Sequence, residues 1–391
     1  MSLSLLLFVL ALLPWLVALR PGRPSSTGDS RGTSKAARAW LLTAPVLYVA
    51  MAVLLYAAES AHLIRGVPPA HRPMRLLARL VYGFGLGFPL VGLIVAARRW
   101  RAGSRRVGAL LWAASLAAAL PTIWALEIEP RQLEIRRYEV SSVRAPALPL
   151  RILHVSDLQT DGRCRRERLA SSFAQSSEPD LVVFTGDLMN ADDPDRYPAL
   201  IDATHAFLSS LHARLGVYGV LGDWDGWGDE WPDVLAAVTA GTSVRFLRNE
   251  TVTLDAGDGT TITLHGMYED DPRESRTEHP ERAAGSELGA LAAAGGLRIV
   301  LAHSPDVLAF DTPIAAGGAD LLLAGHTHGG QIVLPFLGAL TTHTRLGFAG
   351  GRTDLRGMPL IVSRGIGMRG GGAPRARLGC APEVGWIEVR R

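Results

Sequence analysis

Four long apolar stretches lie in the first third of the chain, and they limit its possible folds more than any other feature. They run over residues 3–19, 40–58, 76–97 and 107–126. A helix needs about 20 apolar residues to cross a hydrocarbon core about 30 Å thick, and the last three stretches meet that length. The first is shorter and contains Pro14, but residues 1–10 lack the Lys or Arg of a signal peptide and no small-residue cleavage site follows. We predict an α-helical membrane anchor of about four spans over residues 1–126.

Positive charge in the connecting loops predicts the orientation of these spans. The loops at residues 20–38, 59–75 and 98–106 contain five, three and five Lys or Arg. Loops rich in Lys and Arg stay in the cytoplasm, so the first and third loops are expected there. The N-terminus and everything after Leu126 are then extracytoplasmic. The bias is modest, because further arginines follow the fourth stretch, and an inverted topology with a cytoplasmic domain is the alternative.

The charge of the chain divides near the same place. Residues 1–150 contain 18 Lys or Arg and 6 Asp or Glu, whereas residues 151–391 contain 22 and 31. Basic character therefore belongs to the first part, and no nucleic-acid partner is expected. The two cysteines, Cys164 and Cys380, exclude a disulfide-rich scaffold and a four-Cys metal site. They either pair or remain free thiols.

The sequence changes character after the fourth apolar stretch. Residues 127–148 are polar and alternating, which is typical of a linker that runs into a first strand. From residue 149 onward, short β-branched or Leu-rich runs recur, and such runs predict buried strands. They lie at residues 150–156, 180–186, 216–222, 261–266, 298–303, 320–325, 359–363 and 385–389. Helical patterns at residues 165–175 and 197–213 separate the early runs, so we predict a layered α/β domain over residues 149–391.

Carboxylate or imidazole side chains follow five of these predicted strands. The strand ends carry Asp157 and Gln159, Asp187, Asp223 to Asp225, His303, and His326 with His328. Ligand sites in α/β sheets lie at the carboxyl ends of strands, and Asp and His are ligands of divalent metals. One Asp after a strand is common in turns. Five such ends together predict a metal site.

The order of these motifs resembles the calcineurin-like metallophosphoesterases. The resemblance covers about residues 149–391, and GHTHGGQ at 325–331, SRGIG at 363–367 and CAPEVGWIEV at 380–389 resemble a bacterial membrane-associated branch. It implies a four-layer α/β/β/α sandwich with a dinuclear metal centre that hydrolyses phosphoester bonds. Carried over residue by residue, it implies that Asp187 bridges two metals, which are otherwise held by Asp157 and His328, and by Asp223, His303 and His326. Two such metals can activate a bridging hydroxide for direct attack on phosphorus.

Three positions depart from the family's pattern. Gln159 and Trp224 stand where the family usually has His, and Asp223 stands where it has Asn. The expected metal ligands thus gain a carboxylate and exchange an imidazole for an amide; they are Asp157, Gln159, Asp187, Asp223, His303, His326 and His328. Oxygen donors favour Mn²⁺ or Mg²⁺ over Zn²⁺. We predict two divalent ions, with Mn²⁺ favoured and Zn²⁺, Fe or Mg²⁺ as alternatives.

The departure at Trp224 bears on catalysis. An indole cannot supply a proton at neutral pH, and Asp225 would normally orient the missing His. Our candidate catalytic residues are Asp187, Asp223, Trp224 and Asp225. Either the substrate has a good leaving group, or His265 or His343 replaces the acid, or the protein binds without turnover.

Together these features predict a membrane-anchored, metal-dependent phosphoesterase of the bacterial inner (cell) membrane. Its partners would be the membrane and a phosphorylated small molecule or lipid, cleaved at a phosphoester or pyrophosphate bond. Anchoring beside the bilayer favours a lipid or other cell-envelope substrate. The alternative is a non-catalytic metallophosphoesterase-like binding module with a degenerate site.

Overall fold

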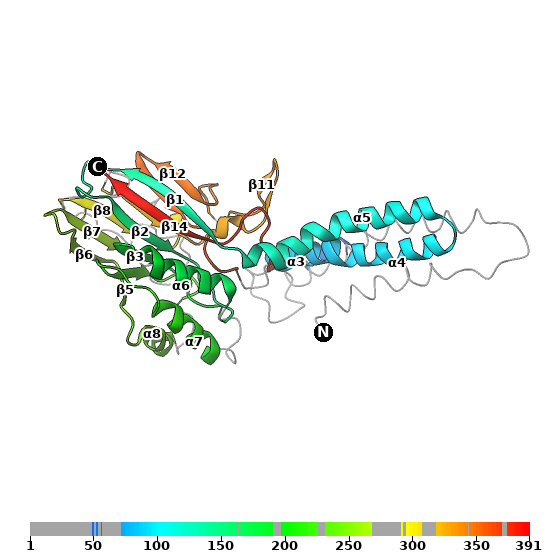
Figure 1. The fold of residues 1–391 in the computed structure, drawn as a ribbon, viewed down its shortest axis with the longest axis horizontal. Coiled ribbons are helices and arrows are strands. Elements are labelled where there is room, and N and C mark those ends of the chain that lie inside the picture. The colour runs from blue at the N-terminus through cyan, green and yellow to red at the C-terminus, as the bar shows by residue number, and fades with distance from the viewer. Residues whose placement is uncertain are drawn as a thin grey trace, which may run out of the picture. The chain divides into compact units, whose positions relative to one another are not determined.

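The structure, a computed structural model, separates into two compact units (Figure 1). The helical unit comprises the chain up to Leu126 with Gly371–Arg375, and the α/β unit comprises Glu127–Gly370 with Ala376–Arg391. The residues that the structure describes are 49–50, 52–53, 56, 72–162, 164–190, 197–225, 231–267, 291, 295–306, 318–342, 344–369 and 374–391.

The described part of the helical unit is a pair of antiparallel helical segments. The elements are α3 (Arg72–Tyr82), the π-helical η2 (Gly83–Gly87), α4 (Phe88–Arg101) and α5 (Arg105–Ile123). Small residues let the segments approach, since a Cβ on Gly92 would lie 2.1 Å from Ser115 Oγ. Among the described residues, the helices Ala78–Arg101 and Arg105–Arg131 are long and apolar enough to cross a membrane. They match the third and fourth predicted spans; the first span, and nearly all of the second, lie outside the described residues.

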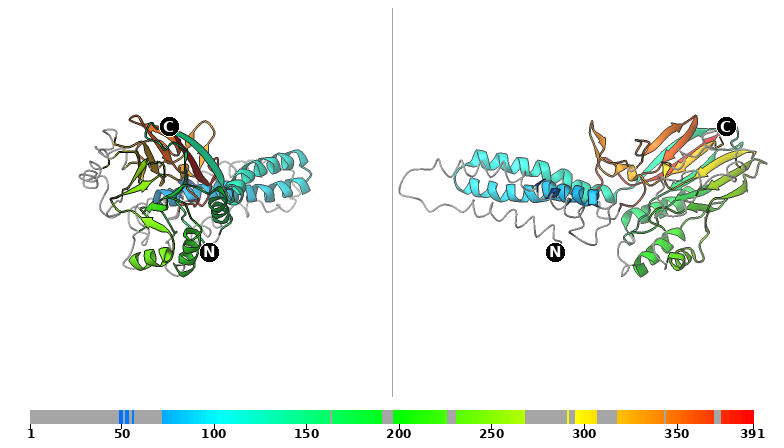
Figure 2. Two further views of the ribbon diagram at one scale, coloured as in Figure 1. Left: turned by 60° about the vertical axis from the view of Figure 1, so that its left-hand side comes forward. Right: turned by 180° about the vertical axis from the view of Figure 1, so that it is seen from behind.

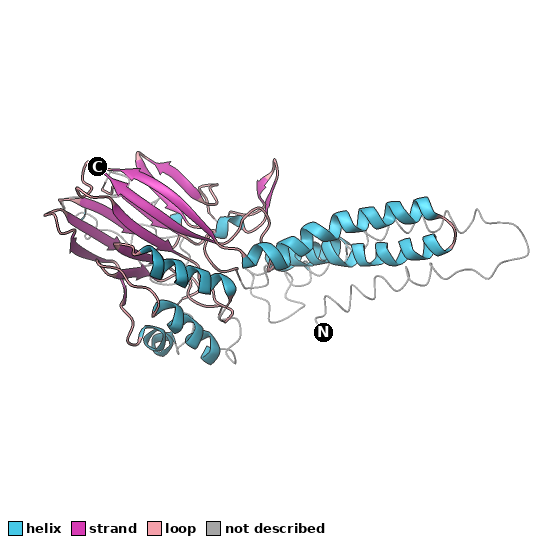
Figure 3. Ribbon diagram, in the orientation of Figure 1, coloured by secondary structure: helices cyan, strands magenta, loops and turns pink. Residues whose placement is uncertain are grey.

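Two six-stranded sheets form the centre of the α/β unit (Figure 3). The first contains, in spatial order, β1 (Glu134–Ser141), β14 (Glu383–Arg390), β2 (Leu150–Val155), β3 (Leu181–Thr185), β4 (Val217–Val220) and β5 (Val244–Phe246). The second contains β12 (Gly351–Leu355), β13 (Met358–Val362), β9 (Leu321–Ala324), β8 (Leu297–Leu301), β7 (Thr261–Gly266) and β6 (Glu250–Asp255). All eight predicted strands are present. A separate two-stranded hairpin consists of β10 (Val333–Leu334) and β11 (Gly338–Ala339).

The stretch expected to be a linker, residues 127–148, contains an edge strand of the first sheet. The short helical turns η3 (Trp124–Ile128) and η4 (Glu129–Arg131) lead into β1, which pairs in parallel with β14 from Glu134↔Glu383 to Ser141↔Arg390. The first and last strands of the unit are therefore neighbours, and Figure 1 shows them side by side. Burial alternates along β1, so one of its faces is more open to solvent than the other, which agrees with its polar, alternating sequence.

Apolar side chains from both sheets fill the space between them. Ile152 and Val183 of the first sheet belong to one buried cluster with Leu264, Ile299 and Leu323 of the second. The sheets therefore pack face to face. All five residues of β3 are buried, because this strand has a covered face on each side.

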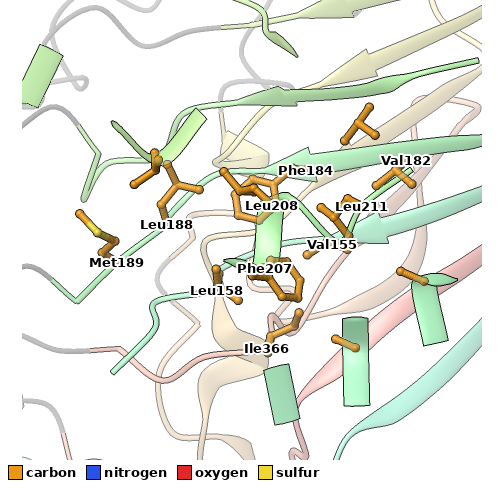
Figure 4. Packing of buried hydrophobic residues seen from close by; sticks show 14 of the residues in the cluster. Val155, Leu158, Val182, Phe184, Leu188, Met189, Phe207, Leu208, Leu211 and Ile366 are labelled. Atoms are coloured by element: carbon orange, nitrogen blue, oxygen red, sulfur yellow. The ribbon is translucent and has the colours of Figure 1, made fainter. Parts of the chain in front are cut away.

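Helices cover the other face of the first sheet. They are α6 (Arg165–Ser177), α7 (Tyr197–Leu208) and α8 (Trp231–Thr239). Figure 4 shows Phe184 of β3 packed with Leu208 and Leu211 at the end of α7. The described residues thus supply a helical layer and two sheet layers. Val300, Leu322 and Leu360 form a buried cluster on the second sheet with Leu291; most of residues 268–294 and 307–317 lie outside the described chain.

Candidate metal centre

The predicted site residues come together where strands of the two sheets end. β2, β3 and β4 are parallel neighbours in the first sheet, and β8 and β9 are parallel neighbours in the second. Loops at their carboxyl ends therefore meet across the two sheets. His303, after β8, lies 3.0 Å from Asp223, after β4 (Nε2 to Oδ1).

One group of donors, which we call the His-rich half-site, consists of Asp223, His303 and His326. Asp223 Oδ1, His303 Nε2 and His326 Nδ1 form a triangle with sides of 3.0, 3.1 and 3.2 Å. Donor atoms bound about 2.1 Å from one ion lie about 3.0–3.4 Å apart for octahedral or tetrahedral angles. The Nδ1 atom of His303 lies 2.7 Å from the carbonyl oxygen of Thr185, which can only accept, so Nδ1 donates there and Nε2 is the ring atom that faces Asp223 and His326. These three atoms fit a single divalent ion.

A second group, the oxygen-rich half-site, consists of Asp157, Gln159, Asp187 and His328. Ligand atoms of Asp157, Asp187 and His303 lie within 4.8 Å of one another, and His328 Nε2 lies 3.4 Å from Asp157 Oδ1. Gln159 Nε2 donates a hydrogen bond of 2.6 Å to Asp187 Oδ2. Its Oε1 is buried and has no hydrogen-bond partner among the described residues. A buried amide oxygen of this kind normally finds a partner, and a second divalent ion would supply one.

The backbone is strained at most of these positions. Five candidate ligands have positive φ: Asp157 (46°), Gln159 (32°), Asp187 (61°), His326 (69°) and His328 (50°). Residues other than Gly rarely adopt this region, and each costs about 1–3 kcal/mol. Strain concentrated on donor residues is typical of functional sites, where the surrounding structure enforces the geometry.

Glycine allows the loops to approach one another. A Cβ on Gly222 would lie 2.2 Å from Asp187 Oδ1, and one on Gly325 would lie 1.8 Å from Ser156 Oγ. Larger residues at these two positions would push the candidate ligands apart. The glycines that precede Asp223 and His326 are thus part of the site.

Asp225 holds two of the loops together. Its Oδ2 accepts the N–H groups of Asp187 and Gly222, both at 2.8 Å, and its Oδ1 accepts the N–H of Leu188 at 2.9 Å. Trp224 is half-buried, and its backbone N–H donates to Asp187 Oδ1 at 3.0 Å. Both oxygens of Asp187 are therefore oriented, one by Trp224 and the other by Gln159.

The centre concentrates buried negative charge. Burial raises the pKa of Asp157 to about 6, and burial together with the charge of Asp187 raises the pKa of Asp225 to about 7. Burial also raises the pKa of Asp187. Burial alone would lower the pKa of His303, but the carboxylates of Asp187, Asp223 and Asp157 outweigh it and raise that pKa well above its usual value. A cluster of this kind favours bound cations, because they compensate carboxylates that water cannot reach.

The two candidate replacement acids are not among these donors. His265 on β7 is buried, its Nδ1 lies 2.8 Å from Thr251 Oγ1 on β6, and burial lowers its pKa to about 4. His343 lies outside the described residues. Cys164 and Cys380 do not form a disulfide.

Two buried residues that support the site carry no recognisable sequence signal. Asn190 Nδ2 donates to the backbone oxygens of Gln159 and Met368 at 3.0 and 3.2 Å. The guanidinium of Arg377 is fully buried and donates to backbone oxygens of the loops around the site. These acceptors are Arg364 (2.8 Å), Gly367 (3.1 Å), Cys380 (3.2 Å) and His328 (3.4 Å). Asn190 lies three residues beyond Asp187 and Arg377 follows no predicted strand, and only the folded chain shows that both contact the loops of the site.

Comparison with known proteins identifies the family to which the chain belongs. The sequence model of the family described as calcineurin-like phosphoesterase matches residues 150–330. An uncharacterized metallophosphoesterase of Bacillus subtilis, YkuE, is 30% identical over 63% of this chain and 82% of its own length. The phosphodiesterase YaeI of Escherichia coli is 26% identical, with 67% and 90% covered. The UDP-2,3-diacylglucosamine pyrophosphatase LpxG of Chlamydia trachomatis is 25% identical, with 56% and 76% covered. The protein with the donor clusters described above therefore belongs to the calcineurin-like phosphoesterase family and is a phosphoester hydrolase.

Proposed function

We propose that this hydrolase holds two divalent metal ions, one in each half-site, and cleaves a phosphoester or pyrophosphate bond. The observation that carries the proposal is the convergence of Asp223, His303 and His326 beside a second donor group with an orphaned amide oxygen. When bound, such ions supply Lewis acidity toward phosphate oxygens. Asp187 lies between the half-sites, 3.5 Å from His303 Nε2, and is the residue we assign to both ions.

The chain's own residues position these ligands. Trp224 N–H and Gln159 Nε2 fix the two oxygens of Asp187, and Thr185 fixes the ring of His303. Asp225 acts as a positioning residue, because both of its oxygens accept backbone N–H groups. We assign the preference of the site to Mn²⁺, since four of its seven candidate donors are oxygens.

The residue at position 224 favours a particular class of substrate. General acid catalysis contributes about 10²–10⁴-fold to hydrolysis when the leaving group needs a proton. Trp224 cannot provide it. We therefore favour a phosphoanhydride, whose leaving phosphate needs no proton, and the resemblance to a pyrophosphatase agrees with that choice.

We further propose a four-span anchor in a bacterial membrane, an extracytoplasmic hydrolase unit and a lipid or envelope substrate. Leu90 on α4 and Leu110 and Leu120 on α5 are exposed, as lipid-facing side chains would be. The five Lys or Arg at residues 98–106 support a cytoplasmic α4–α5 connection. A reporter protein fused after Arg391 tests the orientation: alkaline phosphatase should be active there, and an active cytoplasmic reporter would contradict it.

The chemistry is tested with the full-length protein in detergent, stripped of metal. Hydrolysis of an aryl phosphomonoester, an aryl phosphodiester and a lipid pyrophosphate is measured with Mn²⁺, Mg²⁺ or Zn²⁺. We expect turnover that is highest with Mn²⁺ and the pyrophosphate, and that is lost in Asp187→Asn. The control is Asp255→Asn, which makes the same change on an exposed side chain. Equal rates with Zn²⁺, or a preference for the monoester, would contradict the assigned metal or substrate class.

A further inference from the structure

An apolar hairpin follows directly on the loop that carries the candidate ligands His326 and His328. Residues 332–340 (IVLPFLGAL) include no charged or polar side chain. They form β10 and β11, paired antiparallel with Val333 opposite Ala339 and Leu334 opposite Gly338. The hairpin stands out from the two sheets in Figures 1 and 2. We call residues 332–340 the apolar hairpin.

The end of the apolar hairpin exposes its largest side chains. Phe336 is 107% exposed, Leu337 77% and Leu340 44%. Single exposed apolar residues are ordinary on protein surfaces, but contiguous ones mark a surface that contacts a partner. An uncharged hairpin of this composition would otherwise promote aggregation.

The tip of the apolar hairpin has a strained backbone conformation. Leu337 N–H donates to the Leu334 oxygen at 3.3 Å, so residues 334–337 form a tight turn with Pro335 in its second position. Phe336 occupies the third position with φ +67°. With Pro second, a positive φ at that position is the pattern of a type II turn, which ordinarily has Gly or Asn there. A bulky residue costs about 1–3 kcal/mol in this region, and here it places an aromatic ring at the outermost point.

The base of the apolar hairpin is fixed to the site. Val333 N–H donates to the Leu378 oxygen at 2.8 Å, and Leu378 N–H donates to the Gln331 oxygen at 2.9 Å. Leu340 N–H closes the base by donating to the Ile332 oxygen at 2.9 Å. The apolar hairpin therefore begins four residues after His328, and its hydrogen-bonded base presents the exposed tip.

We propose that the apolar hairpin inserts into the interface of the lipid bilayer beside the catalytic centre. Phe and Leu side chains at such a tip suit the boundary between headgroups and acyl chains. Residues 321–353 contain no Asp or Glu, and the exposed Arg345 and Arg352 follow the hairpin, so this part of the chain suits an anionic membrane surface. The inference rests on the proposed membrane location, and it deepens the proposed function because it brings the centre to the surface where a lipid substrate would lie.

The test places a fluorescent reporter at the tip of the full-length protein in nanodiscs of phosphatidylethanolamine and phosphatidylglycerol. Phe336→Cys is labelled with an NBD dye in a Cys164→Ser background, in which the remaining Cys380 is buried. The matched control is Leu148→Cys. Leu148 is 79% exposed and precedes β2, so it lies at the opposite end of that strand from Asp157. The Cys164→Ser protein without an added cysteine is the blank.

We expect blue-shifted emission at position 336, quenching by doxyl-labelled lipid and protection from aqueous iodide, with the reverse at position 148. Iodide quenching at 336 as strong as at 148 would overturn the proposal. Protection from both quenchers would also overturn it, because the tip would then be covered by protein, such as a second copy of this chain. Hydrolysis of the aryl phosphodiester is measured on the same samples, so a failure of the proposed chemistry is seen separately from a failure of insertion.

Discussion

The two half-sites of the candidate metal centre differ in donor chemistry and in access to water. The His-rich half-site has two imidazoles and one carboxylate, and the side chains of Asp223 and His326 are 22% and 14% exposed. The oxygen-rich half-site is almost closed, since Asp157 and Gln159 are fully buried and Asp187 and His328 are 1% exposed. Buried carboxylates depend more on a compensating ion than exposed ones. We therefore expect the oxygen-rich half-site to exchange its ion more slowly and to depend on that ion more strongly for stability.

The largest expected effect comes from removing a single metal ligand, in either half-site. Asp157→Asn and His326→Ala should each lower kcat by about 100-fold or more, because each removes several kcal/mol of charge stabilisation. The two variants should differ in metal content, measured by mass spectrometry of desalted protein. Asp157→Asn should keep the ion of the His-rich half-site, and His326→Ala the other. If both variants lost both ions, the division into half-sites would be wrong.

A variant of Asp225 tests a residue that positions the metal ligands without binding metal itself. Asp225→Asn replaces one accepting oxygen by an N–H₂ group that faces backbone N–H donors, so the loops after β3 and β4 should separate. We expect a 10–100-fold loss of Mn²⁺ affinity, the range typical of residues that orient ligands, and a lower Tm. Asp255→Asn is the control, because Asp255 also accepts a backbone N–H, from Gly257 at 2.8 Å, but is exposed. An unchanged Mn²⁺ affinity in Asp225→Asn would refute the supporting role.

The side chain at position 159 is expected to influence which metal the oxygen-rich half-site prefers. Gln159→His would make the oxygen-rich half-site more like the His-rich one, so we expect Zn²⁺ affinity to rise relative to Mn²⁺ by about tenfold. Competition titration calorimetry with the two metals measures the ratio. Gln159→Ala is the control and should weaken both metals together. If the ratio of Zn²⁺ to Mn²⁺ affinity were the same in the unaltered protein, Gln159→His and Gln159→Ala, Gln159 would not be a ligand.

The smallest expected effect is on the stability of the metal-free protein. Asp157 and Asp225 hold their protons up to about pH 6 and 7 in the folded chain, whereas unfolded carboxyls titrate near pH 4. Their contribution to stability is therefore complete below pH 4 and is lost as the pH rises through 6 and 7. The raised pKa of His303 acts in the same direction.

Tm should accordingly fall between pH 5 and pH 8 in the presence of a chelator, by roughly 2–4 °C for each kcal/mol lost. The decline should be shallower in Asp157→Asn, which removes one of the titrating groups. Added Mn²⁺ should recover more stability at pH 8 than at pH 5. A metal-free Tm that rises over this interval would contradict the charge balance described for the centre.

Much of the fold can be predicted from the sequence, because the central strands have distinctive local sequences. The eight predicted strands are buried on both faces or nearly so, and their apolar runs end in Gly, Asp or His. Six strands lie outside the eight predicted runs: β1, β5, β6, β10, β11 and β12. The sequences of β1, β6 and β12 alternate with polar residues, as in ETVTLD at residues 250–255, and resemble loop sequence. The helix from residue 197 ends at Leu208, five residues before the predicted end.

The candidate site likewise has a part that the sequence predicts and a part that it does not. The spacing of Asp and His after strands predicts the ligands, because that chemistry is local. The supporting contacts of Asn190, Arg377 and Asp225 join residues far apart in the chain, and no spacing indicates them. The exposure of Phe336 is not evident from the sequence either, since an apolar run such as IVLPFLGAL is also typical of a buried strand.

The position of β14 has a consequence for biosynthesis. This strand, the last in the chain, lies between β1 and β2, the first two strands of the unit. Nascent chains begin to fold from the N-terminus, yet here the backbone groups of β1 and β2 that face β14 have no strand to pair with until residues 383–390 leave the ribosome. If the unit is secreted across the membrane, it must cross without a complete first sheet. A chain that ends before residue 383 would present two open strand edges, and unpaired edges of this kind can pair with other chains.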